Sequence, residues 1–133
     1  MAEISINSSR DCEFINITSQ INAVIPPDMK CGICHIFCKH TTAGLTVNEN
    51  ADPDVKHDLL KKLDALIPKD ERYYLHCEGN SAAHLKSSLM GISLALPIRN
   101  GRLDLGMWQG VYFCEFDGPR SRKVKVLFQT ASE

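Results

Sequence analysis

The sequence predicts a single α+β domain spanning residues 1–133, in which two or three helices cover layers of mixed or antiparallel β-sheet. A length of 133 residues suits one compact domain with its own hydrophobic core. Most apolar segments are short and alternate as strands do, whereas two segments repeat their apolar residues at helical spacing. No linker-like composition divides the chain.

Two strands and a short helix are expected before residue 30. Residues 3–7 and 12–17 alternate apolar and polar side chains, and the turn sequence "SSRD" separates them. Thr18 is a suitable N-cap for a helix over residues 18–24. Pro26 and Pro27 end that helix.

The segment "CGICHIFCKHTTAG" begins with Cys-Gly-Ile-Cys-His, a spelling used for c-type haem attachment. Residues 29–42 are rich in β-branched and aromatic side chains, which predicts a strand. Alternate side chains of a strand point to opposite faces, so Cys31 and Cys34 diverge and cannot bind one metal together. With Cys38 they are expected to be buried thiols, and no haem is expected.

Two helices are expected in the middle of the chain. Asp52 is an N-cap with Pro53 at the first helical position, and Pro68 ends that helix. Its apolar stripe consists of Val55, Leu59, Leu63 and Leu66. The second helix is capped near Asn80 or Ser81 and closed by Gly91. Residues 43–53 are expected to be irregular, and the remaining strands are expected at residues 72–79, 92–98, 102–118 and 122–130.

Charge and hydropathy exclude several function classes. The formal net charge is −1, and the basic run in residues 120–125 is short, so no nucleic-acid partner is expected. No apolar run reaches membrane-spanning length, and the first residues do not resemble a signal peptide. We therefore expect a cytoplasmic protein with no membrane partner, whose six cysteines are reduced.

Polar residues gather where the predicted elements end, as functional residues usually do. His76 ends a predicted strand, Asn80 follows a turn, and His84 lies one turn into the next helix. The helix amides favour phosphate or carboxylate, whereas two imidazoles favour zinc, with His40 as a third ligand. The same histidines can instead transfer protons, and the sequence leaves these roles open.

Three blocks carry a resemblance to a known family: "HTTAGLTVNENADPDVKHDL", "HCEGNSAAHLKSSLMG" and "GMWQGVYFCEFDGPRSRKV". In order and spacing they resemble the signature blocks of the YjbQ family, the secondary thiamine-phosphate synthases. The similarity covers nearly the whole chain and is weakest in the first thirty residues. It implies a homotrimer with polar pockets between subunits. It also implies condensation of a pyrimidine diphosphate with a thiazole phosphate, which releases pyrophosphate.

The resemblance and the chemistry of the side chains together give a set of expected site residues. Arg and Lys suit phosphate, carboxylates suit Mg²⁺ and imidazoles suit zinc, so a divalent metal is an expected cofactor and a phosphorylated small molecule an expected substrate. Lys86 has the ordinary alternative of an exposed helix lysine. The expected catalytic residues are His40, Glu49, His76, His84 and Arg120; the expected substrate or phosphate ligands are Thr41, Thr42, Asn80, Ser81, Lys86, Trp108 and Gln109; the expected metal ligands are His40, His76, His84 and Asp52. Asn50, Gly79 and Glu115 also match the blocks.

Two function classes remain open at this point. The first is a small phosphate-handling or metal-assisted enzyme, of which thiamine-phosphate synthesis is one version. The second is a non-catalytic protein that binds a metal or small ligand, because the chain has no glycine-rich phosphate loop of the Walker type. Turnover that is lost on replacing His76 or His84 would separate the two.

Overall fold

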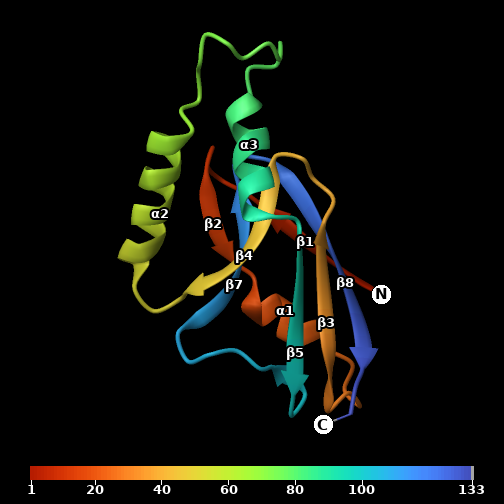
Figure 1. Cartoon of the computed structure of the whole chain (residues 1–133). Coiled ribbons are helices and arrows are strands. Elements are labelled where there is room, and N and C mark those ends of the chain that lie inside the picture. Colours follow the sequence, from red (N-terminus) through yellow and green to blue (C-terminus); the bar gives the residue numbers. More distant parts are fainter. Residues whose placement is uncertain (133) are drawn as a thin grey trace.

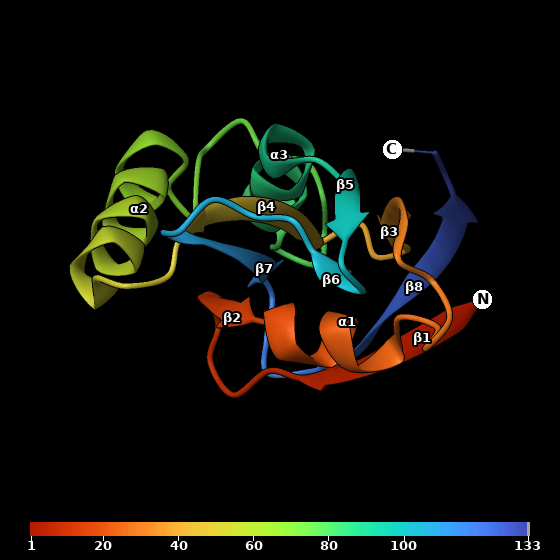
Figure 2. The same cartoon turned by 90° about the horizontal axis from the view of Figure 1, so that it is seen from below.

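Two antiparallel sheets and three helices make up the computed structural model, which describes residues 1–132 (Figures 1 and 2). The larger sheet has the order β1-β8-β3-β5-β6, with β1 (Ala2–Asn7), β8 (Ser121–Thr130), β3 (Cys31–Cys38), β5 (Ser93–Arg99) and β6 (Arg102–Leu103). The smaller has the order β2-β7-β4, with β2 (Glu13–Asn16), β7 (Gln109–Glu115) and β4 (Ala43–Glu49). The helices are α1 (Thr18–Val24), α2 (Pro53–Leu66) and α3 (Ser81–Met90). The predicted α+β class is confirmed.

One hydrophobic core lies between the two sheets and α1. The larger sheet contributes Cys34, Ile36 and Val124, and the smaller contributes Leu45 and Phe113, all at most 1% exposed. Ile17 and Ile21 from the start of α1 are fully buried in the same cluster. Burial of this apolar surface is the main force that holds the sheets face to face.

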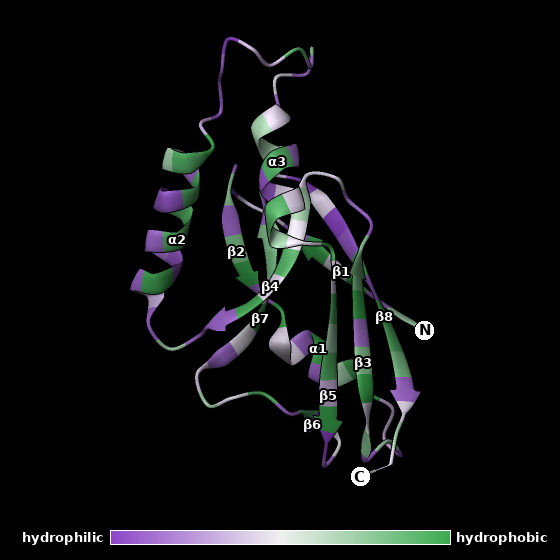
Figure 3. Cartoon of the chain, in the orientation of Figure 1, coloured by the Kyte–Doolittle hydropathy of each residue, from purple (hydrophilic) through white to green (hydrophobic). Residues whose placement is uncertain are grey.

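A second core lies on the other face of the smaller sheet, where α2 and α3 cover it. Tyr112 and Cys114 of β7 point to this side and pack with Leu63 of α2 and Ala83 of α3. Because successive residues of a strand face opposite ways, β7 is buried on both faces and lies at the centre of three layers. Figure 3 shows α2 with alternating apolar and polar stripes, as expected for a helix with one face on a sheet.

The predicted helix boundaries are confirmed, although neither Thr18 nor Asn80 caps its helix with a side-chain hydrogen bond. The Asp52 side chain accepts a hydrogen bond from the amide of Asp54 at 2.9 Å, which caps α2 as predicted. Gly91 ends α3 with a φ of 94°, a conformation that favours glycine. The Thr18 hydroxyl does not cap α1: it donates to Asn16 Oδ1 at 2.6 Å instead. None of the helices in residues 1–132 is long and apolar enough to cross a membrane.

The cysteine-rich strand alternates as predicted. Cys34 and Cys38 face the core at no more than 1% exposure, whereas Phe37 is 44% exposed on the opposite face. Burial raises the pKa of the Cys34 thiol to about 11, so this thiol is protonated and unreactive at neutral pH. Cys31 is only partly buried, and the six cysteines are free thiols.

Three predicted segments differ in the structure. Residues 43–49, expected to be irregular, form β4, because all seven positions pair with β7. Residues 72–79, expected to be a strand, form turns: Tyr73 is 72% and Leu75 96% exposed, and no neighbouring strand is available to pair with them. Residues 102–118 form two strands, because the chain leaves β6 after Leu103 and rejoins a different sheet at β7.

Candidate functional site

His40 and His84 line one surface hollow, although they come from distant parts of the sequence. We call it the histidine hollow; its volume is about 510 Å³ and its walls are Phe37, Cys38, Lys39, His40, Thr41, His84, Ser87, Ser88 and Ile92. His40 and Thr41 follow β3, and His84 lies on α3, which packs against β4. The predicted proximity of His40, Thr41 and His84 is therefore present in the structure.

Close packing of α3 on β4 brings these two sides together. Ser87 is buried and donates a hydrogen bond to the Ala43 carbonyl oxygen at 2.6 Å. A Cβ added to Gly44 would lie 2.8 Å from the Gly91 carbonyl oxygen and 2.9 Å from Met90 Cβ. Only glycine permits this approach, so the sequence "HTTAG" sets the distance between helix and strand as well as supplying the histidine.

The His40 ring is held by the backbone of β8. Its Nε2 lies 3.0 Å from the Lys123 amide nitrogen and 3.1 Å from the Lys123 carbonyl oxygen, and the ring packs edge-on to Phe113. Burial, with a smaller contribution from the positive charge of Arg122, lowers the pKa of His40. The imidazole is therefore neutral at pH 7. Its other nitrogen, Nδ1, makes no hydrogen bond to residues 1–132 and is free to bind a ligand.

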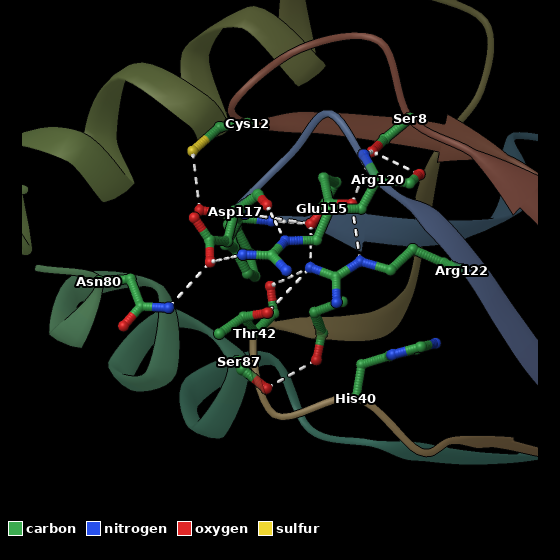
Figure 4. Close-up of polar contacts among 12 residues, drawn as sticks. Ser8, Cys12, His40, Thr42, Asn80, Ser87, Glu115, Asp117, Arg120 and Arg122 are labelled. Carbon is green, nitrogen blue, oxygen red and sulfur yellow. Dashed lines mark hydrogen bonds and ion pairs between the residues drawn. The ribbon is translucent and has the colours of Figure 1, made fainter. Parts of the chain in front are cut away.

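A buried ion pair between Arg122 and Glu115 lies near His40 (Figure 4). Arg122 and Glu115 are 5% and 0% exposed, and Arg122 Nε donates to Glu115 Oε1 at 2.8 Å. Ser8 Oγ donates to the same carboxylate oxygen at 2.7 Å. Burial alone would raise the pKa of Glu115, but hydrogen bonds from Arg122 and Ser8 outweigh it and lower the pKa, so both charges persist.

The ion pair fixes the turn that carries His40. Arg122 Nη2 donates to Thr42 Oγ1 at 2.8 Å, and the next residue, Lys123, holds the His40 ring. Thr42 is only 7% exposed, so its hydroxyl serves the arginine and does not reach the hollow. The sequence interpretation missed Arg122 by grouping it with a surface basic run. The sequence did indicate that Arg122 is buried, because its even spacing from Val124 and Val126 places all three on the same face of β8.

His76 and Ser81 border a second hollow next to the first. This hollow has a volume of about 600 Å³ and is lined by Tyr73, Tyr74, Leu75, His76, Ser81, His84 and Leu85. The rings of His76 and His84 lie 5.4 Å apart between centroids, in an edge-to-face arrangement. His84 thus belongs to both hollows, and the predicted pairing of His76 with His84 is present.

Arg120 and Asn80 meet at Asp117 rather than in the histidine hollow. Arg120 Nη2 and Asn80 Nδ2 donate to the same carboxylate oxygen of Asp117 at 2.9 and 2.8 Å. Arg120 Nε also donates to the Asp117 carbonyl oxygen at 2.7 Å. The guanidinium expected to bind phosphate is therefore already bonded to a carboxylate within the chain.

Lys86 is buried and lies apart from the histidines. Its side chain is 4% exposed, and its ammonium donates to Asp64 Oδ1 of α2 at 2.6 Å. The expected exposed or phosphate-binding lysine is thus a contact between the two long helices. Lys86 lies on the face of α3 that meets the second core, whereas His84 lies on the face that borders the hollows.

The remaining predicted residues form a separate cluster at the far end of β4, which we call the β4-end cluster. Asn50 donates two hydrogen bonds to the segment that follows β6. Its backbone amide donates to the Trp108 carbonyl oxygen and its side-chain Nδ2 donates to the Gln109 carbonyl oxygen, each at 2.9 Å. Glu49 ends β4, and Asp52 caps α2. Seven residues of β4 separate this cluster from His40, which at about 3.3 Å per residue is roughly 20 Å.

No three His, Cys, Asp or Glu side chains within residues 1–132 converge as metal ligands. Nε2 of His40 is held by Lys123, and Asp52 is used as a helix cap on the far side of β4. His76 and His84 are the only predicted ligand pair whose rings are in contact. The expected four-ligand set is therefore not assembled within one chain.

Fold and site together define a small antiparallel α+β protein with a histidine-lined hollow. The chain is similar in sequence and in fold to known proteins. The model of the family described as UPF0047 protein YjbQ-like matches residues 2–131. The UPF0047 protein YugU of Bacillus subtilis is 49% identical over 120 residues, which cover 90% of this chain and 91% of that protein. The chain belongs to the YjbQ-like UPF0047 family, as its sequence blocks predicted.

Solved structures agree with this assignment. The crystal structure of an uncharacterised conserved protein of the yjbq/upf0047 family from Clostridium acetobutylicum has a TM-score of 0.93 and 51% identity, covering 97% of this chain and 100% of that one. A YbjQ-like protein of unknown function from Sulfolobus solfataricus has a TM-score of 0.90 at 30% identity, covering 98% of this chain and 96% of that one. These relatives establish the family and the fold.

Proposed function

We propose that this protein binds a small phosphorylated substrate in the histidine hollow and joins a pyrimidine diphosphate to a thiazole phosphate. The observation that carries the proposal is the shared position of His40, His84 and Lys39 around one hollow. In the reaction the thiazole nitrogen attacks the methylene carbon of the pyrimidine, the carbon–oxygen bond breaks, and pyrophosphate leaves with the bonding electrons. Negative charge therefore grows on the leaving group, which nearby donors and cations stabilise.

The side chains around the hollow have matching chemistry. Lys39 is exposed and supplies a positive charge at the rim, where pyrophosphate can approach. His40 is neutral and rigidly held, so its free Nδ1 can form one oriented hydrogen bond to a heteroaromatic substrate. His84 faces both hollows and lies between the two places where substrate groups would bind.

We further propose that the working site forms between copies of the chain in a homotrimer. The histidine hollow opens on a surface with exposed apolar side chains, including Phe37 at 44%, Leu85 at 48% and Ile92 at 43%. At the β4-end cluster, Met107 and Trp108 are 82% and 60% exposed. Exposed apolar groups of this size favour a partner. In a head-to-tail contact, the surface around the histidine hollow of one copy would pack on the β4-end cluster of the next copy. Repeated around a threefold axis, this contact closes a ring and brings together the two separated groups of predicted site residues.

The test is a pyrophosphate-release assay with both substrates, run on wild type, His84→Ala and a Lys62→Ala control. Lys62 is exposed on α2 and lines neither hollow. We expect His84→Ala to lose at least a hundredfold in kcat/KM, as is usual for the loss of a group that acts in the transition state. Light scattering should return three chain masses for all three proteins. Equal turnover in wild type and His84→Ala would refute the proposal.

The second candidate is binding without turnover. It is favoured by the state of the two expected phosphate ligands, because Arg120 is bonded to Asp117 and Lys86 is buried against Asp64. In that case, calorimetry would detect binding of the thiazole phosphate, weakened by His84→Ala, while no pyrophosphate is released by any variant.

A further inference from the structure

We propose that a groove between α2 and β2 is a second ligand site, specific for a small organic phosphate with an apolar body. We call it the α2 groove. Its volume is about 540 Å³, within the range of small-molecule sites. Its walls are Arg10, Cys12, Glu13, Phe14, Pro53, Lys56, His57, Leu60, Lys61 and Asp64. It shares no lining residue with the histidine hollow, so this inference is independent of the proposed reaction.

Positive charge is concentrated in the α2 groove. Arg10, Lys56 and Lys61 line the groove, and none of them takes part in an ion pair among residues 1–132. The chain as a whole carries a formal charge of −1, so this concentration of positive charge is local. Several cations along walls of low dielectric attract an anion and raise its local concentration.

The two carboxylates in the groove leave an excess of positive charge, because Asp64 is balanced by the ammonium of Lys86 and Glu13 alone offsets one of the three cations. Glu13 Oε2 accepts hydrogen bonds from the amides of Ser9 and Arg10 at 2.6 and 2.9 Å. Asp64 accepts from the buried ammonium of Lys86 at 2.6 Å. The three cations remain available, and a dianionic phosphate matches them better than a single carboxylate.

The groove is also preorganised and partly apolar. The ammonium of Lys56 lies 5.6 Å from the centre of the Tyr112 ring, which holds this long side chain in place. The hydrogen bond that the Arg10 amide donates to Glu13 fixes the loop that carries Arg10. Phe14 and Leu60 provide apolar wall between the cations. A fixed, mixed surface of this kind binds an ester with an organic body more tightly than inorganic phosphate.

Isothermal titration calorimetry of the full chain at low salt tests the inference, with phenyl phosphate and inorganic phosphate as the two probes. We expect phenyl phosphate to bind at least tenfold more tightly than inorganic phosphate. Arg10→Met and Lys61→Met should each weaken phenyl phosphate binding about tenfold, the usual effect of losing one hydrogen bond to a charged group. Binding should also weaken as salt is raised.

Two control variants make the outcome decisive. Lys62→Met removes an exposed lysine of the same helix outside the groove and should change the affinity less than twofold. His84→Ala should also leave it unchanged. Equal losses for Lys61→Met and Lys62→Met would mean general attraction to a basic surface and would overturn the inference. Loss of binding in His84→Ala alone would place phenyl phosphate in the histidine hollow and would equally overturn it, while supporting the proposed reaction.

Discussion

The buried pair of Glu115 and Arg122 gives the sharpest prediction of stability. Replacing Arg122 with Met removes two hydrogen bonds to Glu115 and two to Thr42, and leaves a carboxylate with 0% exposure without its cation. Breaking one side of such a pair costs about 3–5 kcal/mol. A domain of this size is stable by roughly 5–15 kcal/mol, so the variant should lose a large share of its stability.

The double variant Glu115→Leu/Arg122→Met separates charge from packing. It removes both charges together, and the cost that remains comes from Ser8 and from backbone amides that lose their acceptor. We therefore expect the double variant to be more stable than Arg122→Met alone by about 1–3 kcal/mol. Urea unfolding followed by circular dichroism measures this, with Lys69→Met, which breaks an exposed ion pair, as the control. The single variants Arg122→Met and Glu115→Leu are measured beside it. If the stability lost by the double variant equals the sum of their two losses, the pair is not coupled and the reasoning is refuted.

The same pair sets the sign of a pH effect. The folded protein holds the pKa of Glu115 below its ordinary value of 4.5, so the unfolded chain takes up the proton first as the pH falls. The resulting stabilisation is complete above pH 4.5 and is lost as the pH drops through the lower pKa of the folded state. Glu115→Gln should be less stable at pH 7 but should show a flatter decline below pH 4.5 in thermal melts.

Four further outcomes are expected. Gly44→Ala should lower stability by about 1–3 kcal/mol in urea unfolding, because the added Cβ meets the backbone at the end of α3; an unchanged midpoint would show that α3 shifts freely. Burial lowers the pKa of His40, so protonation favours the unfolded state. The stability contributed by the neutral imidazole should be complete above pH 6.5 and should fall below it. Thermal melts from about pH 7 to 5 should show this decline in wild type but not in His40→Asn. Asp64→Asn should destabilise the protein by about 1–3 kcal/mol because it leaves the Lys86 ammonium buried and unpaired, whereas Lys86→Met should change stability by less than about 1 kcal/mol; equal losses would contradict this asymmetry. A single chain should bind zinc no more tightly than micromolar, and metal analysis should find no zinc in His84→Ala. A content near one tightly bound zinc per chain would show that a second copy supplies a ligand.

Sequence patterns predicted most of the fold because most elements carry their own local signals. Asp52 with Pro53 marked the start of α2, and Gly91 marked the end of α3. The strand predicted over residues 72–79 is wrong, because an alternating pattern forms a strand only where a partner strand is available, and that depends on tertiary structure. The strand over residues 43–49 was not predicted, because small residues at its start, Ala43 and Gly44, and polar residues at its end obscured the Leu-Thr-Val alternation at its centre.

The candidate site was predicted in part. The position of His84 one helical turn after Asn80 and near His76 follows from local geometry, and this portion is present. The burial of Lys86 could not be found locally, because it depends on Asp64 from another helix. The separation of Trp108 from His40 follows from the direction of β4, which no local pattern contains.

The order of strands in the larger sheet has a consequence for how the protein is made. β8 lies between β1 and β3 and pairs with both, so β1 has no strand to pair with until β8 has been synthesised. During translation, β8 is synthesised more than a hundred residues after β1, and until then the apolar side chains of Ile4 and Ile6 remain uncovered. The larger sheet therefore closes in one late step, and a nascent chain that stops before β8 lacks the strand that joins β1 to β3.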